Sequence, residues 1–326
     1  MKSIATLTMN PTIDVAYDVD RMIHTHKMRT VSEHYCPGGG GINVARVFVR
    51  LGGNARSIYM AGGATGDAFD GLMDLHQLVH SRVRISGHTR IATSALELET
   101  AKEYRFTPQG PVVTEAEWRT CLALIDEVHC DILVASGSLP RGVPENFYAL
   151  VAARLRRRGI GIVLDTSGPA LRQGLAEGGG VMLVKPSQGE LARLAGRELD
   201  TTAAIAKEAM AIVERGEAKL VAVTLGHRGA VLARQEGATY LPALDIEARS
   251  AVGAGDSFLA AMVYGLASDW DAYEAFRYGM AGGGASVLNP GSGLAQPADI
   301  DRLHSLVPSV PSIAENLIHC AEPTPV

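Results

Sequence analysis

Residues 250–267, SAVGAGDSFLAAMVYGLA, combine two glycines and an acid with the start of a long apolar run. Gly253 and Gly255 flank Ala254, and Asp256 follows directly. The apolar run predicts a helix that begins at about this point. Free backbone N–H groups at a helix start favour an anion. Asp256 is then either a helix cap or a general base beside a phosphoryl group held by those N–H groups. The segment alone leaves both roles open.

A second glycine cluster lies in residues 37–53, PGGGGINVARVFVRLGG. Four consecutive glycines precede a predicted helix, and Asn43 falls in its first turn. Glycine has no Cβ, so a substrate can lie against the backbone there. The amide of Asn43 both donates and accepts hydrogen bonds, which suits a sugar hydroxyl or a phosphate. The alternative is a flexible entry loop before a core helix.

Four further polar residues gain a functional interpretation only beside these clusters. Asp14, in NPTID, follows the first predicted strand and is either a ligand for substrate hydroxyls or an ordinary turn aspartate. Lys27, Arg29 and Arg90 fall on a predicted small sheet. They are either a site for a substrate phosphate, which Arg90 can bind through two parallel hydrogen bonds, or solvated charges of edge strands.

Two segments in the second half of the chain suggest nucleotide contacts. In LVKPSQGE, residues 183–190, Lys185 and Glu190 lie at a predicted strand end and helix start. Glu190 either orients magnesium through water or is a first-turn glutamate favoured by the helix dipole. TLGHRGA, residues 224–230, is either a nucleotide-binding turn or a hairpin turn, and we expect His227 to be a surface residue.

The composition and the missing motifs exclude several classes of protein. There is no G-x-x-x-x-G-K-[ST] and no G-x-G-x-x-G, so a P-loop is excluded and a dinucleotide site is disfavoured. A net charge of −5 argues against nucleic acid as a partner. No apolar run has the length of a membrane span. Asn10 and Pro11 interrupt the first apolar stretch, so we expect no signal peptide.

The cysteines indicate the compartment. Cys36, Cys121, Cys130 and Cys320 have no metal-binding or redox spacing. We therefore expect reduced thiols in a cytoplasmic protein.

The elements that must position these residues follow an alternating pattern. Short apolar runs ending in Gly, Ser, Thr or Pro predict strands buried on both faces, and the segments between them predict helices. This order predicts an α/β fold with a mostly parallel sheet covered by helices on both sides. The expected strands are 3–9, 55–62, 131–137, 161–168, 181–187 and 219–226, and the expected helices are 41–51, 67–80, 114–128, 144–158, 188–195, 202–215, 255–267, 270–288 and 297–306.

Two segments break this rhythm. Residues 12–36 and 90–107 alternate polar and apolar side chains and predict a small antiparallel sheet beside the main domain. We expect the site where that sheet meets the carboxyl ends of the parallel strands. An exposed apolar face on the small sheet predicts a homodimer. The expected units are a core of 1–11, 37–88 and 109–315, a lid and dimer contact of 12–36 and 89–108, and a loose tail of 316–326.

Together these segments resemble the PfkB (ribokinase-like) carbohydrate kinases. GGGGINVAR is similar to the first signature of that family, and SAVGAGDSFLAA is similar to the second. TLTMNPTID, SGSLP, VKPSQGE and TLGHRGA occur in the family's order, so the resemblance runs from residue 3 to about residue 306. It implies a ribokinase-like three-layer α/β/α fold with a β-sheet lid. AGGATG and EYRF are most similar to the phosphofructokinase branch.

The resemblance implies an ATP-dependent kinase that acts on a phosphorylated ketohexose, first of all fructose 6-phosphate. Tagatose 6-phosphate and fructose 1-phosphate are the alternative substrates within the same chemistry. A non-catalytic sugar-phosphate sensor and a dinucleotide-binding oxidoreductase are the alternatives from other classes. Neither nucleic acid nor a membrane is an expected partner.

The resemblance also implies a role for each site residue. Asp256 is the general base, and the N–H groups of residues 253–256 form an anion hole for the transferring phosphoryl group. Glu190 places the magnesium that accompanies ATP. Where the family usually has Asn, this chain has Ser187, so we expect weaker binding of ATP or magnesium. The remaining implied contacts are Asp14, Gly39, Asn43 and Ser138 for the sugar; Lys27, Arg29 and Arg90 for its phosphate; Lys185, Ser187, Thr224, Gly226, Gly229 and Asn289 for ATP; and carbonyls near Ser250, Val252 and Asn289 for a potassium ion.

Overall fold

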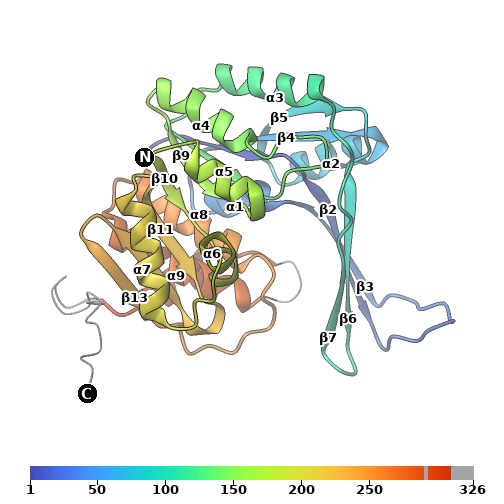
Figure 1. Cartoon of the computed structure of the whole chain (residues 1–326). Coiled ribbons are helices and arrows are strands. Elements are labelled where there is room, and N and C mark those ends of the chain that lie inside the picture. The colour runs from blue at the N-terminus through green and yellow to red at the C-terminus, as the bar shows by residue number, and fades with distance from the viewer. Residues whose placement is uncertain (290–292, 310–326) are drawn as a thin grey trace.

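The computed structural model describes residues 1–289 and 293–309, and it contains two β-sheets (Figure 1). The larger sheet has nine strands in the order β13-β12-β11-β10-β9-β8-β1-β4-β5. From β5 to β11 all neighbours are parallel, whereas β12 and β13 are antiparallel. The strands are β1 (Ile4–Thr8), β4 (Ala55–Gly62), β5 (Val79–Ile85), β8 (Ile132–Ser136), β9 (Gly161–Asp165), β10 (Val181–Val184), β11 (Ala218–Thr224), β12 (Ala230–Arg234) and β13 (Gly237–Leu241).

Helices cover both faces of this sheet, as the alternating pattern predicts. Every residue of β1 and of β8 is buried, which is typical of parallel strands between two helical layers. One layer consists of α3 (Glu115–Glu127), α4 (Phe147–Arg157), α5 (Gly168–Ala176), α6 (Gln188–Ala195) and α7 (Thr202–Glu214). The other consists of α1 (Gly40–Arg50), α2 (Gly63–Leu75), α8 (Ala254–Ala267), α9 (Ala272–Val287) and α10 (Pro297–His304).

One helix is shorter than the sequence predicts, and four elements, β5, α5, β12 and β13, were not predicted. The helix expected over 67–80 ends at Leu75, because Gln77 takes a left-handed conformation with φ of 55°. The chain then forms β5, an edge strand whose alternating sequence VHSRVRI suits a half-exposed position. Helix α5 and the hairpin of β12 and β13 were not predicted. Both are too short to show a long periodic pattern of apolar residues: α5 begins at Gly168 and has nine residues, and β13 begins at the turn glycine Gly237 and has five.

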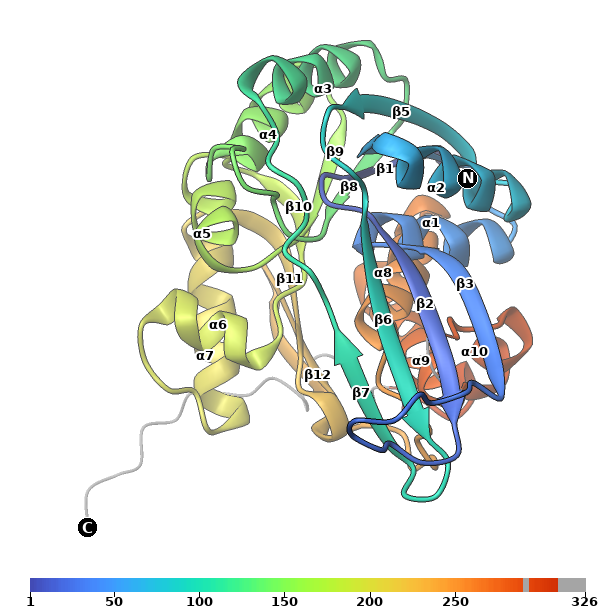
Figure 2. The ribbon, with the colours of Figure 1, turned by 90° about the vertical axis from the view of Figure 1, so that its right-hand side faces the viewer.

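The smaller sheet, which we call the lid, has the order β3-β2-β6-β7 (Figure 2). Its two outer pairs are antiparallel, as expected, but its central pair, β2 with β6, is parallel. The chain leaves the core twice in the same direction and returns each time along an outer strand, which makes the two outgoing strands parallel. The lid strands are β2 (Thr12–Val19), β3 (Ser32–Gly38), β6 (Arg90–Glu97) and β7 (Lys102–Phe106).

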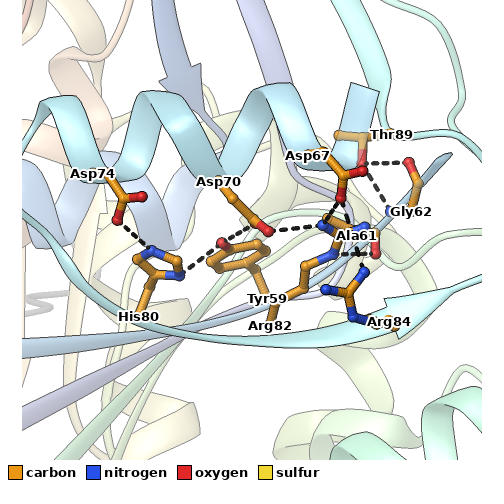
Figure 3. Close-up of polar contacts among 10 residues, drawn as sticks. All are labelled: Tyr59, Ala61, Gly62, Asp67, Asp70, Asp74, His80, Arg82, Arg84 and Thr89. Carbon is orange, nitrogen blue, oxygen red and sulfur yellow. Dashed lines mark hydrogen bonds and ion pairs between the residues drawn. The ribbon is translucent and has the colours of Figure 1, made fainter. Parts of the chain in front are cut away.

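A polar network joins α2 to strands β4 and β5 near the base of the lid (Figure 3). Tyr59 of β4 donates a hydrogen bond to Asp70 of α2 at 2.6 Å, and its hydroxyl lies 2.9 Å from Nδ1 of His80 of β5. The ring nitrogen Nε2 of His80 lies 3.0 Å from Asp74. Burial raises the pKa of Tyr59, so the phenol keeps its proton and remains a donor.

Arg82 extends the same network toward the lid. Its Nε donates to the Ala61 carbonyl at 2.9 Å, and its Nη1 contacts Asp67 and Asp70, each at 2.7 Å. Beside it, the Gly62 N–H donates to the Thr89 hydroxyl at 3.1 Å. The network therefore positions the residue that immediately precedes the second entry into the lid.

We expect Tyr59→Phe to lower the free energy of unfolding by about 1–2 kcal/mol. The substitution removes a buried donor and leaves Asp70 and His80 without this partner. The measurement is equilibrium urea denaturation. Tyr104→Phe is the matched control, since the hydroxyl of this lid tyrosine has no partner among the described residues, and we expect a change below about 0.5 kcal/mol. Equal midpoints for the two variants would contradict the role given to the network.

Candidate active site

Asp256 lies in the first turn of α8, but it does not cap that helix. The N-cap is Gly253, which has φ of 71°, and no side chain caps this helix. A Cβ on Gly253 would lie 2.5 Å from the Leu294 side chain, so both backbone angle and space require glycine. The Ala254 N–H donates to the Ala251 carbonyl at 3.4 Å, and no side chain among the described residues occupies the other N–H groups of the first turn, which remain available to an anion.

The carboxylate of Asp256 is held by a residue of α1. Asn43 Nδ2 donates to Asp256 Oδ2 at 2.8 Å. Burial, and after it the negative charge of Asp165, raise the pKa of Asp256 to about 7, against the Asn43 hydrogen bond and the positive charge of Lys185, which lower it. A carboxylate with a pKa near neutrality is suited to accept a proton from a hydroxyl.

Lys185 and Asp165 form a buried ion pair beneath Asp256. Their Nζ and Oδ1 atoms are 3.1 Å apart, and both side chains are largely buried. Ser136 at the end of β8 donates to the other oxygen of Asp165 at 3.1 Å. These groups come from the carboxyl ends of β8 and β9 and the residue after β10, where ligands bind in parallel sheets. Asp165 was not among the residues predicted from the sequence, although it is the last residue of a buried strand, β9, where a ligand-binding side chain is expected.

Asp14 comes from the lid and faces the same region. It is paired in register with Cys36 on β3 and Ala92 on β6. Gly38 allows its close approach, since a Cβ there would lie 2.0 Å from Asp14 Oδ2. Burial raises the pKa of Asp14 to about 6, and its negative charge also helps to raise the pKa of Asp256. The lid and two helices of the core thus bring Asp14, Asn43 and Asp256 together.

The glycine run before α1 passes close to the ends of the central strands. Gly39 has φ of 110°, and a Cβ on it would lie 2.8 Å from the Thr8 side chain. A Cβ on Gly40 would lie 2.1 Å from Ser136 Oγ. Ser138 follows β8 and accepts a hydrogen bond from Asn10 at 3.4 Å. This close packing explains why the chain needs glycine where α1 begins.

The structure does not bring the three expected phosphate ligands together. Arg90 donates to the backbone carbonyls of Asn10 at 2.7 Å, Pro108 at 3.0 Å and Pro11 at 3.4 Å. It therefore ties three of the points where the chain passes between core and lid. Lys27 and Arg29 lie in the exposed connection between β2 and β3, which projects away from the core in Figure 1.

The residues expected to contact the nucleotide lie along the other half of the sheet. Ser187 and Glu190 form a capping box at the start of α6, in which Glu190 accepts from the Ser187 N–H and hydroxyl, each at 2.8 Å. Thr224 forms a bridge with Ser187. The segment 224–230 is a single 3₁₀ turn, Gly226–Arg228, leading to Gly229 and then to the antiparallel strand β12. A Cβ on Gly229 would lie 2.0 Å from the Leu241 carbonyl.

Of the expected potassium ligands, Ser250 and Val252 lie just before α8, and Asn289 lies just after α9. Ser250 Oγ accepts from the Val252 N–H at 3.2 Å, and the Val252 carbonyl accepts from Ser286 at 3.3 Å. Asn289 donates to the carbonyls of Ala285 at 3.0 Å and Leu294 at 3.5 Å. These bonds order the backbone around the N-terminus of α8.

The described part of the chain contains no metal-binding cluster, no membrane-spanning helix and no disulfide. Residues 1–289 and 293–309 contain no group of three or more His, Cys, Asp or Glu side chains arranged to hold a metal ion. Within the same ranges, no helix is long and apolar enough to cross a bilayer. Cys36, Cys121 and Cys130 form no disulfide, and Cys320, like the predicted tail 316–326, lies outside the described residues.

Comparison with known proteins places this geometry in one family. Residues 7–299 match the model of the pfkB family of carbohydrate kinases. The chain belongs to that family. It is 39% identical over 308 residues to ATP-dependent 6-phosphofructokinase isozyme 2 of Mycobacterium tuberculosis strain H37Rv, covering 93% of this chain and 89% of the relative. The isozyme 2 enzyme of Escherichia coli K12 is 36% identical, covering 94% of this chain and 99% of the relative.

Solved structures of the family have the same fold. A crystal structure of phosphofructokinase-2 from Escherichia coli in complex with potassium superposes with a TM-score of 0.90, at 36% identity, over 94% of this chain and 99% of that one. A complex of the same enzyme with fructose 6-phosphate gives 0.88 at 35% identity, with the same coverage. The three-layer core and the β-sheet lid expected from the pfkB resemblance are therefore confirmed.

We expect Asp256→Asn to be more stable than the wild-type protein at pH 8. In the folded protein the pKa of Asp256 is about 7, against 3.8 for the free side chain, so folding favours its protonated form. The wild type therefore loses stability through this group as the pH rises from about 4 to about 7. Asparagine keeps a contact to Asn43 and carries no charge to bury.

The measurement is the melting temperature of both proteins between pH 5 and pH 8. The advantage of Asp256→Asn should grow as the pH rises and level off above about pH 7. Asp269→Asn is the control, since Asp269 is exposed and its pKa is lowered by Lys2. An advantage for Asp256→Asn that does not depend on pH would contradict this account of the buried carboxylate.

Proposed function

We propose that this kinase transfers the γ-phosphoryl group of ATP to the free primary hydroxyl of fructose 6-phosphate, giving fructose 1,6-bisphosphate and ADP. The observation that carries the proposal is the buried Asp256 carboxylate, held by Asn43 at the uncapped start of α8. The two isozyme 2 relatives carry the name ATP-dependent 6-phosphofructokinase, which supports this choice of substrate.

In the proposed step Asp256 takes the proton of the attacking hydroxyl. The hydroxyl oxygen forms a bond to the γ-phosphorus as the bond from that phosphorus to the bridging oxygen of ADP breaks. The N–H groups of Gly253, Ala254 and Gly255 would receive the charge on the transferring phosphoryl oxygens. Catalysis by this arrangement is mainly positioning and charge stabilisation.

The core residues fit a nucleotide at this place. Lys185 is a buried cation close to Gly255, where a Cβ would lie 3.4 Å from the lysine Nζ. We assign Lys185, Ser187, Thr224, Gly226, Gly229 and Asn289 to ATP, and carbonyls near Ser250, Val252 and Asn289 to potassium. Glu190 would hold magnesium, which neutralises phosphate charge when bound. Because Glu190 already accepts two hydrogen bonds from Ser187, its contact to the ion would run through water.

The sugar would lie between the lid and the start of α1, where we assign it to Asp14, Gly39, Asn43 and Ser138. The pKa of Asp14, about 6, leaves it ionised at neutral pH and able to accept hydrogen bonds from sugar hydroxyls. Arg90 is paired in register with Thr12, two residues before Asp14, so it shares the lid face of Asp14. To bind the sugar's phosphate, the Arg90 side chain would give up one of its hydrogen bonds to a backbone carbonyl and donate to a phosphate oxygen in its place.

We propose that Lys27 and Arg29 reach this phosphate only from a second copy of the chain. The connection that carries them begins beyond Val19, about 16 Å along β2 from Asp14 at the usual rise per residue. In a homodimer that forms through the lid, the connection between β2 and β3 of one copy would bring these two cations to the sugar-phosphate site of the other copy. We also propose a cytoplasmic location, in keeping with the unpaired Cys36, Cys121 and Cys130.

An exposed apolar patch on the lid supports this dimer. Register places its members on the face opposite Asp14. Tyr35 aligns with Val15, Ile91 with Ile13 and Tyr104 with Ala95, and Phe106 aligns with Thr93, which is itself paired with Val15. Phe106 is 59% exposed and Tyr35 is 49% exposed, which is unusual for side chains of this size in a folded monomer. The members of the patch are Tyr35, Ile91, Tyr104 and Phe106.

Two other substrates fit the same chemistry. Fructose 1-phosphate is favoured as the alternative by a Bacillus subtilis 1-phosphofructokinase, 28% identical over 88% of this chain. Tagatose 6-phosphate differs from fructose 6-phosphate in one stereocentre. A sugar-phosphate sensor is disfavoured because the buried carboxylate and the uncapped helix are both present, and an oxidoreductase is disfavoured by the missing dinucleotide motif.

The test is ADP release from magnesium-ATP with fructose 6-phosphate, tagatose 6-phosphate, fructose 1-phosphate, fructose and ribose. We expect the highest kcat/KM with fructose 6-phosphate and a fall in kcat/KM below about pH 7, as Asp256 becomes protonated. Asp256→Asn should lower kcat by ~10²–10⁴-fold while sugar binding persists. Turnover with unphosphorylated sugars alone would overturn the phosphate-binding roles, and near-normal turnover by Asp256→Asn would overturn the base.

The dimer has its own test in the lid patch. We expect Phe106→Asp to shift the protein from dimer to monomer in light scattering and to raise the KM for fructose 6-phosphate. Both effects follow from a charge placed in the apolar contact that brings Lys27 and Arg29 to the site. Leu75→Asp, an exposed apolar position at the end of α2, is the control and should leave the mass unchanged. A wild-type protein that is monomeric with substrate present would contradict the dimer.

A further inference from the structure

A cavity of about 390 Å³ lies between the lid and the core, to one side of the proposed catalytic groups. We call it the seam cavity. Its core wall is formed by Arg46 and Arg50 of α1 and by Arg249, which precedes α8. Its lid wall includes His34 and Ser94, which share a face of the lid with Asp14. No catalytic or ligand-binding role assigned so far uses these three arginines.

Arg46 is a buried guanidinium with an incomplete set of partners. The residue is 5% exposed, and its Nη1 donates to the Pro37 carbonyl at 3.2 Å and to Asn43 Oδ1 at 3.4 Å. Its Nε is buried without a partner. Among the described residues no carboxylate forms an ion pair with it, although the charge of Arg46 lowers the pKa of Asp14. A buried charge in this state is costly unless a counter-charge is supplied.

The other two arginines increase the positive charge around the same space. Arg50 lies one helical turn beyond Arg46, and within the described ranges its side chain donates only to the carbonyls of Leu294 and Ala295, at 3.3 and 3.4 Å. Burial and Arg46 lower the pKa of Arg50. Burial and both arginines lower the pKa of His76, which also lines the cavity. Arg249 forms no ion pair within the described ranges.

Two carboxylates of the lid also line the cavity, but neither neutralises the arginines. Asp18 accepts a hydrogen bond from Ser32 at 2.6 Å, and Glu103, the second residue of β7, is exposed. Neither forms an ion pair with Arg46, Arg50 or Arg249 in the part of the chain that is described. The core wall of the seam cavity therefore carries three guanidinium groups, none of which forms an ion pair among the described residues.

We propose that the seam cavity binds a phosphoryl dianion, either inorganic phosphate or the phosphate group of a small phosphorylated molecule. Guanidinium groups match phosphate oxygens through paired hydrogen bonds, and the free Nη2 of Arg46 would take part with Arg50 and Arg249. The volume lies within the range of small-ligand pockets. This site is separate from the transferring phosphoryl group at α8 and from the sugar phosphate at Arg90. A bound anion would join the core wall to the lid wall and favour one position of the lid.

The test measures binding directly and needs no turnover, so it is independent of the proposed function. Inorganic phosphate and, separately, glycerol 3-phosphate are titrated into the full-length protein by calorimetry, with and without saturating fructose 6-phosphate. We expect binding that persists with fructose 6-phosphate present. The double variant Arg50→Gln/Arg249→Gln should weaken it by at least ~10-fold, since a hydrogen bond to a charged group contributes this much.

Because Arg50 also holds backbone carbonyls, Arg249→Gln alone serves as the second variant and should weaken binding severalfold with an unchanged melting temperature. Arg56→Gln is the matched control, since Arg56 is an exposed arginine on β4 whose side chain, among the described residues, hydrogen-bonds only to Ser81. Binding of glycerol 3-phosphate with the same dependence on the arginines would assign the site to phosphorylated molecules, and binding of phosphate alone would assign it to the inorganic ion. No phosphate binding, displacement by fructose 6-phosphate, or full binding by the double variant would overturn the proposal.

Discussion

The rest of the structure depends on keeping the carboxylate of Asp256 buried and usable. Its charge is opposed by Asp165 and by loss of water, and it is supported by Asn43 and Lys185. These supports come from α1 and from the residue that follows β10, so no local segment can supply them. The parallel sheet brings the carboxyl ends of its strands to one edge. Helix α8, which is apolar over most of its surface, packs between α1 and α9 and holds Asp256 at that edge.

A second constraint concerns the lid. The chain passes between core and lid four times in a small space, at the start of β2, the end of β3, the start of β6 and the end of β7. Arg90 ties three of these crossings by donating to carbonyls, and Arg46 holds the fourth at Pro37. The two arginines thus join the lid to the core on opposite sides of Asp14. Arg90 finds acceptors for its guanidinium in three carbonyls of the chain, whereas the Arg46 Nε has no partner among the described residues. This unmet hydrogen-bonding capacity is the reason why the seam cavity is a candidate anion site of its own.

Much of the fold follows from local patterns. The buried strands β1, β8, β9 and β10 are short apolar runs with clear ends, and α3 begins at a capping box that the sequence contains in full. The edge elements were missed for a physical reason. Strand β5 is stabilised by pairing with β4 and by the contacts of Tyr59 and Arg82 with α2, so its identity depends on neighbours far along the chain. The pairing of β2 with β6 is likewise set by the direction in which the chain leaves the core.

The sequence by itself determined the family, the alternating α/β order and the place of Asp256 at a glycine-rich helix start, because these depend on residues adjacent in the chain. Only the tertiary structure decided which groups meet. It paired Lys185 with Asp165, joined Asn43 to Asp256, turned Arg90 toward backbone carbonyls and left the Arg46 Nε without a partner among the described residues. Those outcomes depend on burial and on the geometry of distant strands and helices, because the free energy of a buried charge is set by the groups that the whole fold places around it.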